Sequence, residues 1–236
     1  VIEAEAKRKR APIVQIDRDF RVRSSDTRSS HTRSSDVRDA TFDVETARGT
    51  LSGLRVALAG AHQRDNAACA VAVLQALGAR SIQVSDRDIA KGIARVRWPA
   101  RLETLGQRPS VLLDAAHNPD GCAALAAHLG TLPRKGRRVL VFGVMADKDF
   151  APMLRLLLPE IDHVIYAPPP MSRAASARAL SAVHEGEVAE SVAEALARAK
   201  RRAGRAGLVV VAGSIFVVAE ARRSLLGLRA DPLIRM

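Results

Sequence analysis

The sequence predicts an α/β fold whose larger part is a Rossmann-like three-layer domain with a mainly parallel sheet. Two observations predict it. From Arg101 onward, short runs of Val, Leu and Ile alternate with amphipathic helical patterns. These strand runs are apolar at nearly every position, which is typical of strands buried on both faces. Buried strands that alternate with helices form a parallel sheet covered by helices on both sides.

The elements of this part follow one another along the chain without a long gap. Each strand is expected at a run of Val, Leu or Ile, and each helix at the periodic apolar pattern that follows the run. Only the strand near Val188 is weak. The predicted order is strand 111–114, helix 119–129, strand 138–142, helix 151–158, strand 163–166, helix 176–183, the weak strand, helix 191–203, strand 208–212 and a final helix from Ser214.

The first 97 residues carry a weaker pattern. A short apolar stretch predicts a strand at 12–16, and a five-residue repeat, VRSSD-TRSSH-TRSSD, follows at 22–36. No apolar side chain recurs there at a spacing that could bury a face, so we expect disorder or an exposed hairpin over residues 21–39. Regular structure resumes near Phe42, with a strand at 54–58, a helix at 65–77 that Gly78 ends, and a helix at about 85–93.

A turn at Trp98-Pro99-Ala100 marks the expected domain boundary, which gives domains 1–97 and 98–236. No apolar run is long enough to cross a bilayer and no leader opens the chain, so we expect a cytoplasmic protein truncated at its N-terminus. Cys69 and Cys122 each lie in an Ala-rich helical pattern and are expected to be buried free thiols. The histidines show no metal-ligand spacing with them, and we expect no metal site within this chain.

The formal net charge of +12 raises the question of nucleic-acid binding. The excess is arginine spread along the whole chain, and aromatic residues that could stack on bases make up only 3%. We therefore expect a generally basic surface, without a nucleic-acid partner. An Arg/Ser repeat can bind RNA, so a non-catalytic basic RNA-binding module remains an alternative.

Polar residues follow three of the predicted strands, where a parallel sheet gathers its ligands. They are Asp114 to Pro119, Gly143 to Asp149, and Gly213 with Ser214. No strand is followed by G-x-G-x-x-G, and neither the phosphate loop G-x-x-x-x-G-K-[ST] nor the serine elbow G-x-S-x-G occurs. The residues alone therefore support an adenylate or small-anion site without its phosphate clamp.

Five motif regions occur in a fixed order between about Leu51 and Arg222. They are LSGL at 51–54 with GAHQRDNA at 60–67, WPARLE at 98–103, LDAAHNP at 113–119, FGVMADKD at 142–149 and GSIF at 213–216. Together they resemble the C-terminal portion of the folylpolyglutamate and dihydrofolate synthases of the Mur ligase superfamily. The resemblance implies that residues 1–97 are the end of the central ATP-binding domain and residues 98–236 the Rossmann-like C-terminal domain.

The resemblance also implies nucleotide contacts. Asn66, with Gln63, would recognise the adenine edge, Asp114 would accept from the ribose hydroxyls, and Arg101 would bind the phosphates. Asn66 could instead bond its own helix backbone, and Arg101 could be an ordinary surface arginine. The family glycine of the W-P-G-R segment is Ala100 here, which is tolerated unless the position needs a positive φ.

His117 would lie beside the nucleotide as the catalytic residue, and a capping or structural role is the alternative. Ser214, at a helix N-terminus, would bind a carboxylate of the glutamate substrate. The implied reaction uses ATP and Mg²⁺ to activate dihydropteroate or folate as an acyl phosphate, which L-glutamate then attacks. The Mg²⁺ ligands and the phosphate loop would lie in a preceding N-terminal domain, so we expect the chain alone to be inactive.

One relative within the superfamily offers a further alternative. A peptidoglycan-precursor ligase would share the C-terminal domain, but the motifs D-x-A-H-N-P and G-A-H-Q favour a ligase that acts on folates. By the same resemblance we expect a monomer without a membrane partner.

Overall fold

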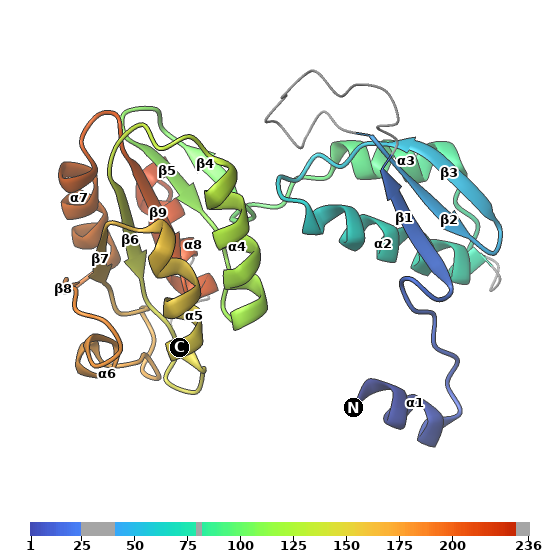
Figure 1. Ribbon diagram of the computed structural model, residues 1–236, viewed down its shortest axis with the longest axis horizontal. Coiled ribbons are helices and arrows are strands. Elements are labelled where there is room, and N and C mark those ends of the chain that lie inside the picture. The colour runs from blue at the N-terminus through green and yellow to red at the C-terminus, as the bar shows by residue number, and fades with distance from the viewer. Residues whose placement is uncertain (25–40, 79–81, 230–236) are drawn as a thin grey trace. The chain divides into compact units, whose positions relative to one another are not determined.

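A computed structural model describes residues 1–24, 41–78 and 82–229. The chain divides into two units, Val1–Arg97 and Trp98–Met236 (Figure 1). Within the described ranges, no helix is long and apolar enough to cross a membrane.

The second unit is built on a six-stranded sheet in the order β4-β5-β9-β6-β7-β8. Strands β5 to β9 pair in parallel, and only the edge strand β4 runs antiparallel, to β5. The predicted Rossmann-like fold class is confirmed. Its elements are β4 (Glu103–Leu105), β5 (Ser110–Leu113), α4 (Pro119–Thr131), β6 (Arg138–Phe142), α5 (Phe150–Leu157), the 3-10 turn η1 (Leu158–Glu160), β7 (His163–Tyr166), α6 (Ala177–Ser181), β8 (Glu187–Val188), α7 (Val192–Ala203), β9 (Leu208–Ala212) and α8 (Ile215–Leu226).

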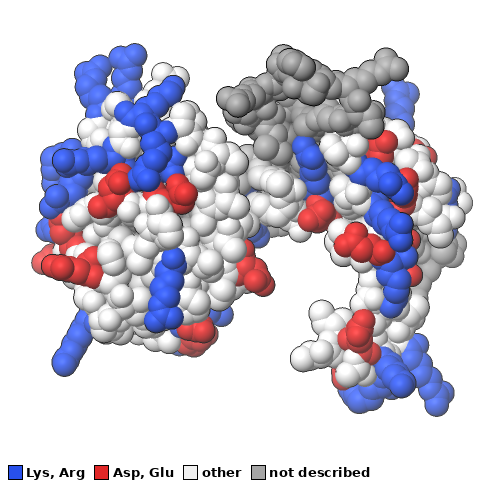
Figure 2. Space-filling model, in the orientation of Figure 1, with Lys and Arg blue, Asp and Glu red and all other residues white. Residues whose placement is uncertain are grey.

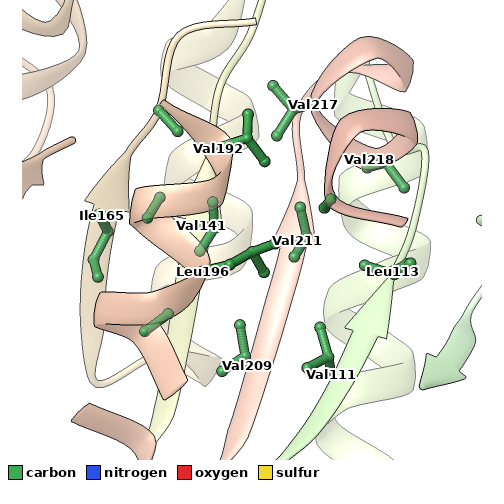
Figure 3. Close-up of a cluster of buried hydrophobic side chains, with 14 of the residues drawn as sticks. Val111, Leu113, Val141, Ile165, Val192, Leu196, Val209, Val211, Val217 and Val218 are labelled. Carbon is green, nitrogen blue, oxygen red and sulfur yellow. The ribbon is translucent and has the colours of Figure 1, made fainter. Parts of the chain in front are cut away.

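Helices cover both faces of this sheet because its strands are apolar on both sides. Side chains alternate along a strand, so each central strand sends one set of residues to each face. Figure 3 shows one face, where Val192 and Leu196 of α7 and Val217 of α8 pack on Val141 and Val211. Helices α4 and α5 lie on the opposite face (Figure 1). The carboxyl ends of the strands are thereby left as the open edge where loops can gather.

The first unit is a small antiparallel sheet with two helices, α2 and α3, packed against it and a third helix, α1, at its N-terminus. The sheet has the order β1-β2-β3, and its buried core contains Phe42, Val44 and Val71 at 0% exposure. The helix at its N-terminus has no buried residue. Its elements are α1 (Ile2–Lys9), β1 (Phe20–Ser24), β2 (Phe42–Thr46), β3 (Gly49–Leu54), α2 (His62–Gly78) and α3 (Asp86–Arg95).

The basic residues are distributed over the surface. On the face drawn in Figure 2, Lys and Arg side chains occur on both units and acidic side chains lie among them. Several described arginines are paired within their own unit, such as Arg198 with Glu194 and Arg223 with Glu220. The net charge of +12 is therefore spread over the chain and partly balanced locally.

The structure can be compared with two predictions for the start of the first unit, and the first of them was wrong. The apolar stretch 12–16 is not a strand, because Val14 and Ile16 stay 55% and 37% exposed and Pro12 lacks a backbone N–H. For the segment 21–39 we expected disorder or an exposed hairpin, and its first four residues belong to strand β1. They pair with β2 while Phe20 is buried at 4% exposure. Residues 25–39 of that segment lie outside the described residues.

Three further differences concern short or small elements. The strand expected at 54–58 ends at Leu54, because β3 starts at Gly49 and pairs with β2 through a tight hairpin. The antiparallel strand β4 has only three residues and was missed. Cys122 is buried as expected, but Cys69 is exposed because it lies on the outer side of α2.

Candidate functional site

Three strand-end loops meet at the carboxyl edge of the large sheet. Strands β5, β9 and β6 are direct neighbours, and the loops after them are hydrogen-bonded to one another. The N–H of Gly213 donates to the carbonyl of Ala116 at 2.9 Å, and the N–H of Gly143 donates to that of Ala212 at 3.4 Å. The structure thus places Asp114, Gly143 and Ser214 in adjoining loops, as the sequence pattern suggested.

Two glycines allow neighbouring strand ends at this edge to approach one another closely. A Cβ on Gly143 would lie 2.0 Å from the carbonyl oxygen of Ala167, and one on Gly213 would lie 2.6 Å from the carbonyl oxygen of Gly143. Gly213 also has a φ of +105°, which L side chains rarely adopt. The edge is therefore built by close approach of backbone to backbone.

Asp114 directly follows β5, and its buried carboxylate connects two backbone segments. It is 6% exposed; its Oδ2 accepts from the N–H of Leu102 at 2.9 Å, and its Oδ1 accepts from the N–H of Ala116 at 2.9 Å. The carboxylate therefore ties the segment around Arg101 to the loop that follows β5.

Arg101 itself is exposed and lies between two residues with positive φ. Ala100 has a φ of +61° and Leu102 one of +47°. The N–H of Ala100 donates to Oε2 of Glu103 at 2.8 Å, and its carbonyl accepts from the N–H of Ala115 at 2.8 Å. The position of the missing glycine thus does need a positive φ, and alanine occupies it under strain.

His117 has a defined ring orientation. Its Nδ1 lies 2.8 Å from the carbonyl oxygen of Ala115. Because a carbonyl oxygen only accepts, Nδ1 must carry the hydrogen, and a neutral ring then presents Nε2 as an acceptor. The helix cap that was the alternative for His117 comes from Asn118 instead, whose Oδ1 accepts from the N–H of Gly121 at 2.8 Å.

Ser214 caps helix α8. It is 3% exposed, and its Oγ accepts from the N–H of Phe216 at 3.2 Å. The hydroxyl therefore has a structural role at the edge of the site. Its contact with a glutamate carboxylate stays a prediction.

In the first unit, Gln63 and Asn66 form one amide chain at the start of α2. Gln63 is 4% exposed; its Oε1 accepts from Nδ2 of Asn66 at 3.1 Å, and its Nε2 lies 2.8 Å from Nε2 of His62. Asn66 is exposed, and its carbonyl oxygen and second N–H are not engaged by this bond. Gln63 thus orients Asn66, and the other predicted site residues belong to the second unit.

The thiol of Cys122 lies close enough to Asp114 for the charge of that carboxylate to affect its pKa. Burial, and after it the charge of Asp114, raise the pKa of Cys122 to about 12. A thiol with that pKa is protonated at neutral pH and is a poor nucleophile. The carboxylate, and not the cysteine, is therefore the charged group at this end of β5.

Sequence reasoning missed two residues of this region. Glu103 and Arg222 form an ion pair in which Nε of Arg222 lies 2.9 Å from Oε2 of Glu103. Glu103 was visible only as the last letter of the WPARLE motif, and nothing in the sequence connects it with a residue 119 positions away.

Comparisons with known proteins show which family the sequence and fold resemble. Residues 100–215 match the Mur ligase glutamate ligase domain. The chain is 38% identical over 193 residues to a probable bifunctional folylpolyglutamate synthase/dihydropteroate synthase of Haloferax volcanii, which covers 78% of this chain and 22% of that protein. It is 35% identical over 195 residues to the dihydrofolate synthase/folylpolyglutamate synthase of Escherichia coli, covering 80% of this chain and 45% of that protein.

A solved structure is similar over almost the whole chain. Escherichia coli FolC in complex with DHPP and ADP has a TM-score of 0.78 at 30% identity, and the match covers 96% of this chain and 50% of that chain. The chain spans less than half the length of the curated relatives named above.

Proposed function

The chain belongs to the folylpolyglutamate synthase and dihydrofolate synthase family of the Mur ligase superfamily, and we propose that it supplies part of the nucleotide and glutamate sites of an ATP-dependent ligase. The ligase would add L-glutamate to dihydropteroate, to folates or to both. The observation that carries the proposal is the meeting of the three loops after β5, β9 and β6 at one edge of the sheet. This edge is where α/β sheets bind nucleotides.

Each residue has a role that its environment supports. Asp114 would accept from the ribose hydroxyls, while its two backbone bonds hold the loop in place. Arg101 is exposed and can present two N–H groups to phosphate oxygens. His117 would orient the nucleotide or the incoming amine through Nε2, because Nδ1 is held by a carbonyl. Ser214 would bind a glutamate carboxylate beside its capping bond.

The adenine edge would be read by Asn66. Adenine presents an amino donor and a ring-nitrogen acceptor, and a carboxamide can satisfy both at once. Gln63 holds the Asn66 amide from one side and so fixes which of its atoms face outward. The buried position of Gln63 makes it an orienting residue rather than a direct contact.

The described residues fit a nucleotide better than they fit a metal ion. The exposed Arg101 guanidinium, the Asp114 carboxylate and the Asn66 amide match phosphate, ribose and base respectively. Within the described ranges, no group of three or more His, Cys, Asp or Glu side chains is placed to hold a metal ion. As the family resemblance implies, we propose that the Mg²⁺ ligands belong to a preceding N-terminal domain, and that Mg²⁺ would neutralise charge on the transferred phosphoryl group.

The proposed reaction is acyl activation followed by amide formation. A carboxylate oxygen of the pteroate or folate attacks the terminal phosphorus of ATP, and ADP leaves. The amine nitrogen of L-glutamate then attacks the acyl carbon, and inorganic phosphate leaves with the electron pair of the broken C–O bond. The residues of this chain would bind and orient the reactants, which is the main source of rate in such transfers.

We further propose that the chain alone is inactive as a ligase and is a monomer. The sequence contains no G-x-x-x-x-G-K-[ST] loop to hold the terminal phosphate. Release of ADP that depends on glutamate, measured with the isolated chain, would overturn this part. No observation on the described residues favours an RNA-binding module or a peptidoglycan-precursor ligase.

The test compares the affinity for ADP of the unaltered chain with that of the Asp114→Asn variant. NMR titration measures both affinities. The variant removes the charge and sets an N–H₂ group against a backbone N–H, so we expect ADP binding to weaken by roughly tenfold. Asp162→Asn is the matched control, because Asp162 also accepts from a backbone N–H, that of Arg138 at 2.8 Å, at the opposite end of the sheet. Equal ADP affinity in Asp114→Asn and the unaltered chain would refute the assignment.

A further inference from the structure

A relay of contacts leads from helix α8 to the segment that carries Arg101. Nε of Arg222 donates to both carboxylate oxygens of Glu103, at 3.1 and 2.9 Å. Oε2 of Glu103 also accepts from the backbone N–H of Ala100 at 2.8 Å. The side chains of Arg222 and Glu103 are only 27% and 21% exposed, so the pair is largely shielded from water. A shielded pair of this kind is stronger than one on the open surface.

The segment needs to be held because it is strained. Ala100 and Leu102 both have positive φ, and neither is glycine. A backbone in this region persists only when its surroundings fix it. Glu103 fixes the N–H of Ala100, and Asp114 fixes the N–H of Leu102 at 2.9 Å. The backbone N–H groups of the residues before and after Arg101 are thereby held by two different carboxylates.

These two anchors differ in what they touch beyond the segment. Asp114 is itself assigned to the ribose, so its loss would change the nucleotide contacts directly. Glu103 is assigned no contact with the nucleotide, and its remaining partner is Arg222 on α8. Glu103 can therefore influence the nucleotide only through the backbone that carries Arg101.

We propose that Glu103 and Arg222 are positioning residues that hold the strained backbone at Ala100 and thereby direct the Arg101 guanidinium to the phosphates of the bound nucleotide. The inference rests on the proposed function, which assigns the phosphates to Arg101. It adds that this contact depends on an ion pair that itself touches no ligand.

Helix α8 offers a matched control. Arg223, the next residue, pairs with Glu220 of the same helix, with Nε donating to Oε2 at 2.9 Å. Its side chain is 37% exposed, and the pair does not reach the Arg101 segment. Arg223→Met thus removes the same charge from the same helix without touching the relay, and it corrects for any long-range attraction between α8 and phosphate.

The experiment measures the dissociation constants of ADP and of adenosine by NMR titration of the full chain. We expect Arg222→Met to weaken ADP by about five- to tenfold and to leave adenosine within about twofold, because only ADP carries phosphates. Arg223→Met should change neither. Arg222→Lys, which keeps a donor and the charge, should recover part of the ADP affinity. Glu103→Ala should repeat the selective loss and guards against a folding defect peculiar to one variant.

A double-mutant cycle then links the relay to Arg101. In a chain that already carries Arg101→Ala, the further change Arg222→Met should leave ADP affinity unaltered, because the group it directs is gone. Additive losses, or equal losses for ADP and adenosine, would mean that the pair only supports the fold, and the inference would fall while the proposed function stands. Failure of the unaltered chain to bind ADP would overturn both.

Discussion

The backbone contact at Gly143 gives a sharp test of how the site edge is built. Gly143→Ala adds one methyl group, whose carbon would lie 2.0 Å from the carbonyl oxygen of Ala167 and 2.8 Å from Cγ2 of Val217. Ordinary van der Waals contact begins near 3.4 Å, so one of these groups must move by more than 1 Å. Ala167 is 1% and Val217 0% exposed, so neither has space to move into.

The cost follows from what such a movement breaks. Overpacking a filled core costs about 1–3 kcal/mol. The N–H of Ala167 donates to the carbonyl of Phe142 at 3.0 Å, and parting the ends of β6 and β7 would lose this bond at about 1 kcal/mol. We therefore expect Gly143→Ala to lower the free energy of unfolding of the second unit by about 3 kcal/mol. That is a large share of a total that is typically about 5–15 kcal/mol.

The assay is urea unfolding followed by near-ultraviolet circular dichroism. Tyr166 is the only tyrosine in the sequence and is 1% exposed in the second unit, so its signal reports this unit and not the first. With a slope of about 1–3 kcal/mol per molar urea, the loss corresponds to a midpoint about 1–3 M lower. Gly130→Ala, in helix α4, is the control. The nearest atom that its Cβ would meet is Oε1 of Glu160 at 3.5 Å, which is an ordinary contact distance.

Alanine is more favourable than glycine in a helix by up to about 1 kcal/mol. The urea midpoint of Gly130→Ala should therefore equal that of the unaltered chain or lie slightly above it. A Gly143→Ala chain with the same midpoint as Gly130→Ala would refute the close approach of the strand ends.

Two further predictions concern titratable groups of the described residues. Cys122 is 0% exposed and its pKa is raised to about 12 by burial, so iodoacetamide at pH 8 should modify the exposed Cys69 first and reach Cys122 only after unfolding. Mass spectrometry of timed samples checks this, and equal rates would contradict it. The backbone N–H of Arg138 holds the pKa of Asp162 below its ordinary value near 3.8. A lowered pKa contributes stability above the unfolded pKa and loses it as pH falls through the folded one. Asp162→Asn should therefore unfold more easily at neutral pH, and its difference from the unaltered chain should shrink below about pH 4. A difference independent of pH would contradict the ionic origin.

The large sheet was predictable because its strands are buried on both faces. Strands β6, β7 and β9 have the predicted bounds. Each is mainly a run of apolar residues whose side chains are buried, and the strand ends where this run ends. The loops after β5, β6 and β9 could be placed at one edge for the same reason. Parallel strands end together, so the position of a residue after its strand fixes its place in the site.

Short elements and long-range pairs were not predictable from local pattern. Strand β4 has three residues and β1 lies at the start of a polar repeat, so neither shows a period that sequence reasoning can detect. The pairing of Glu103 with Arg222 depends on the return of the chain through α8 to the β4 edge. Only the folded structure shows which of the many arginines meets this glutamate.

The alanine at position 100 shows why a departure from a family motif does not by itself argue against a site. Its φ of +61° costs about 1–2 kcal/mol relative to glycine. Against this, its methyl group is buried at 9% exposure in the main core, which contributes roughly 0.8 kcal/mol. Glycine would also lose more chain entropy on folding, by about 0.5–1 kcal/mol. The opposing terms are equal within their precision, so alanine can hold the same backbone shape that glycine would. Because Glu103 and Asp114 fix that shape from outside, the segment around Arg101 does not need glycine to adopt it.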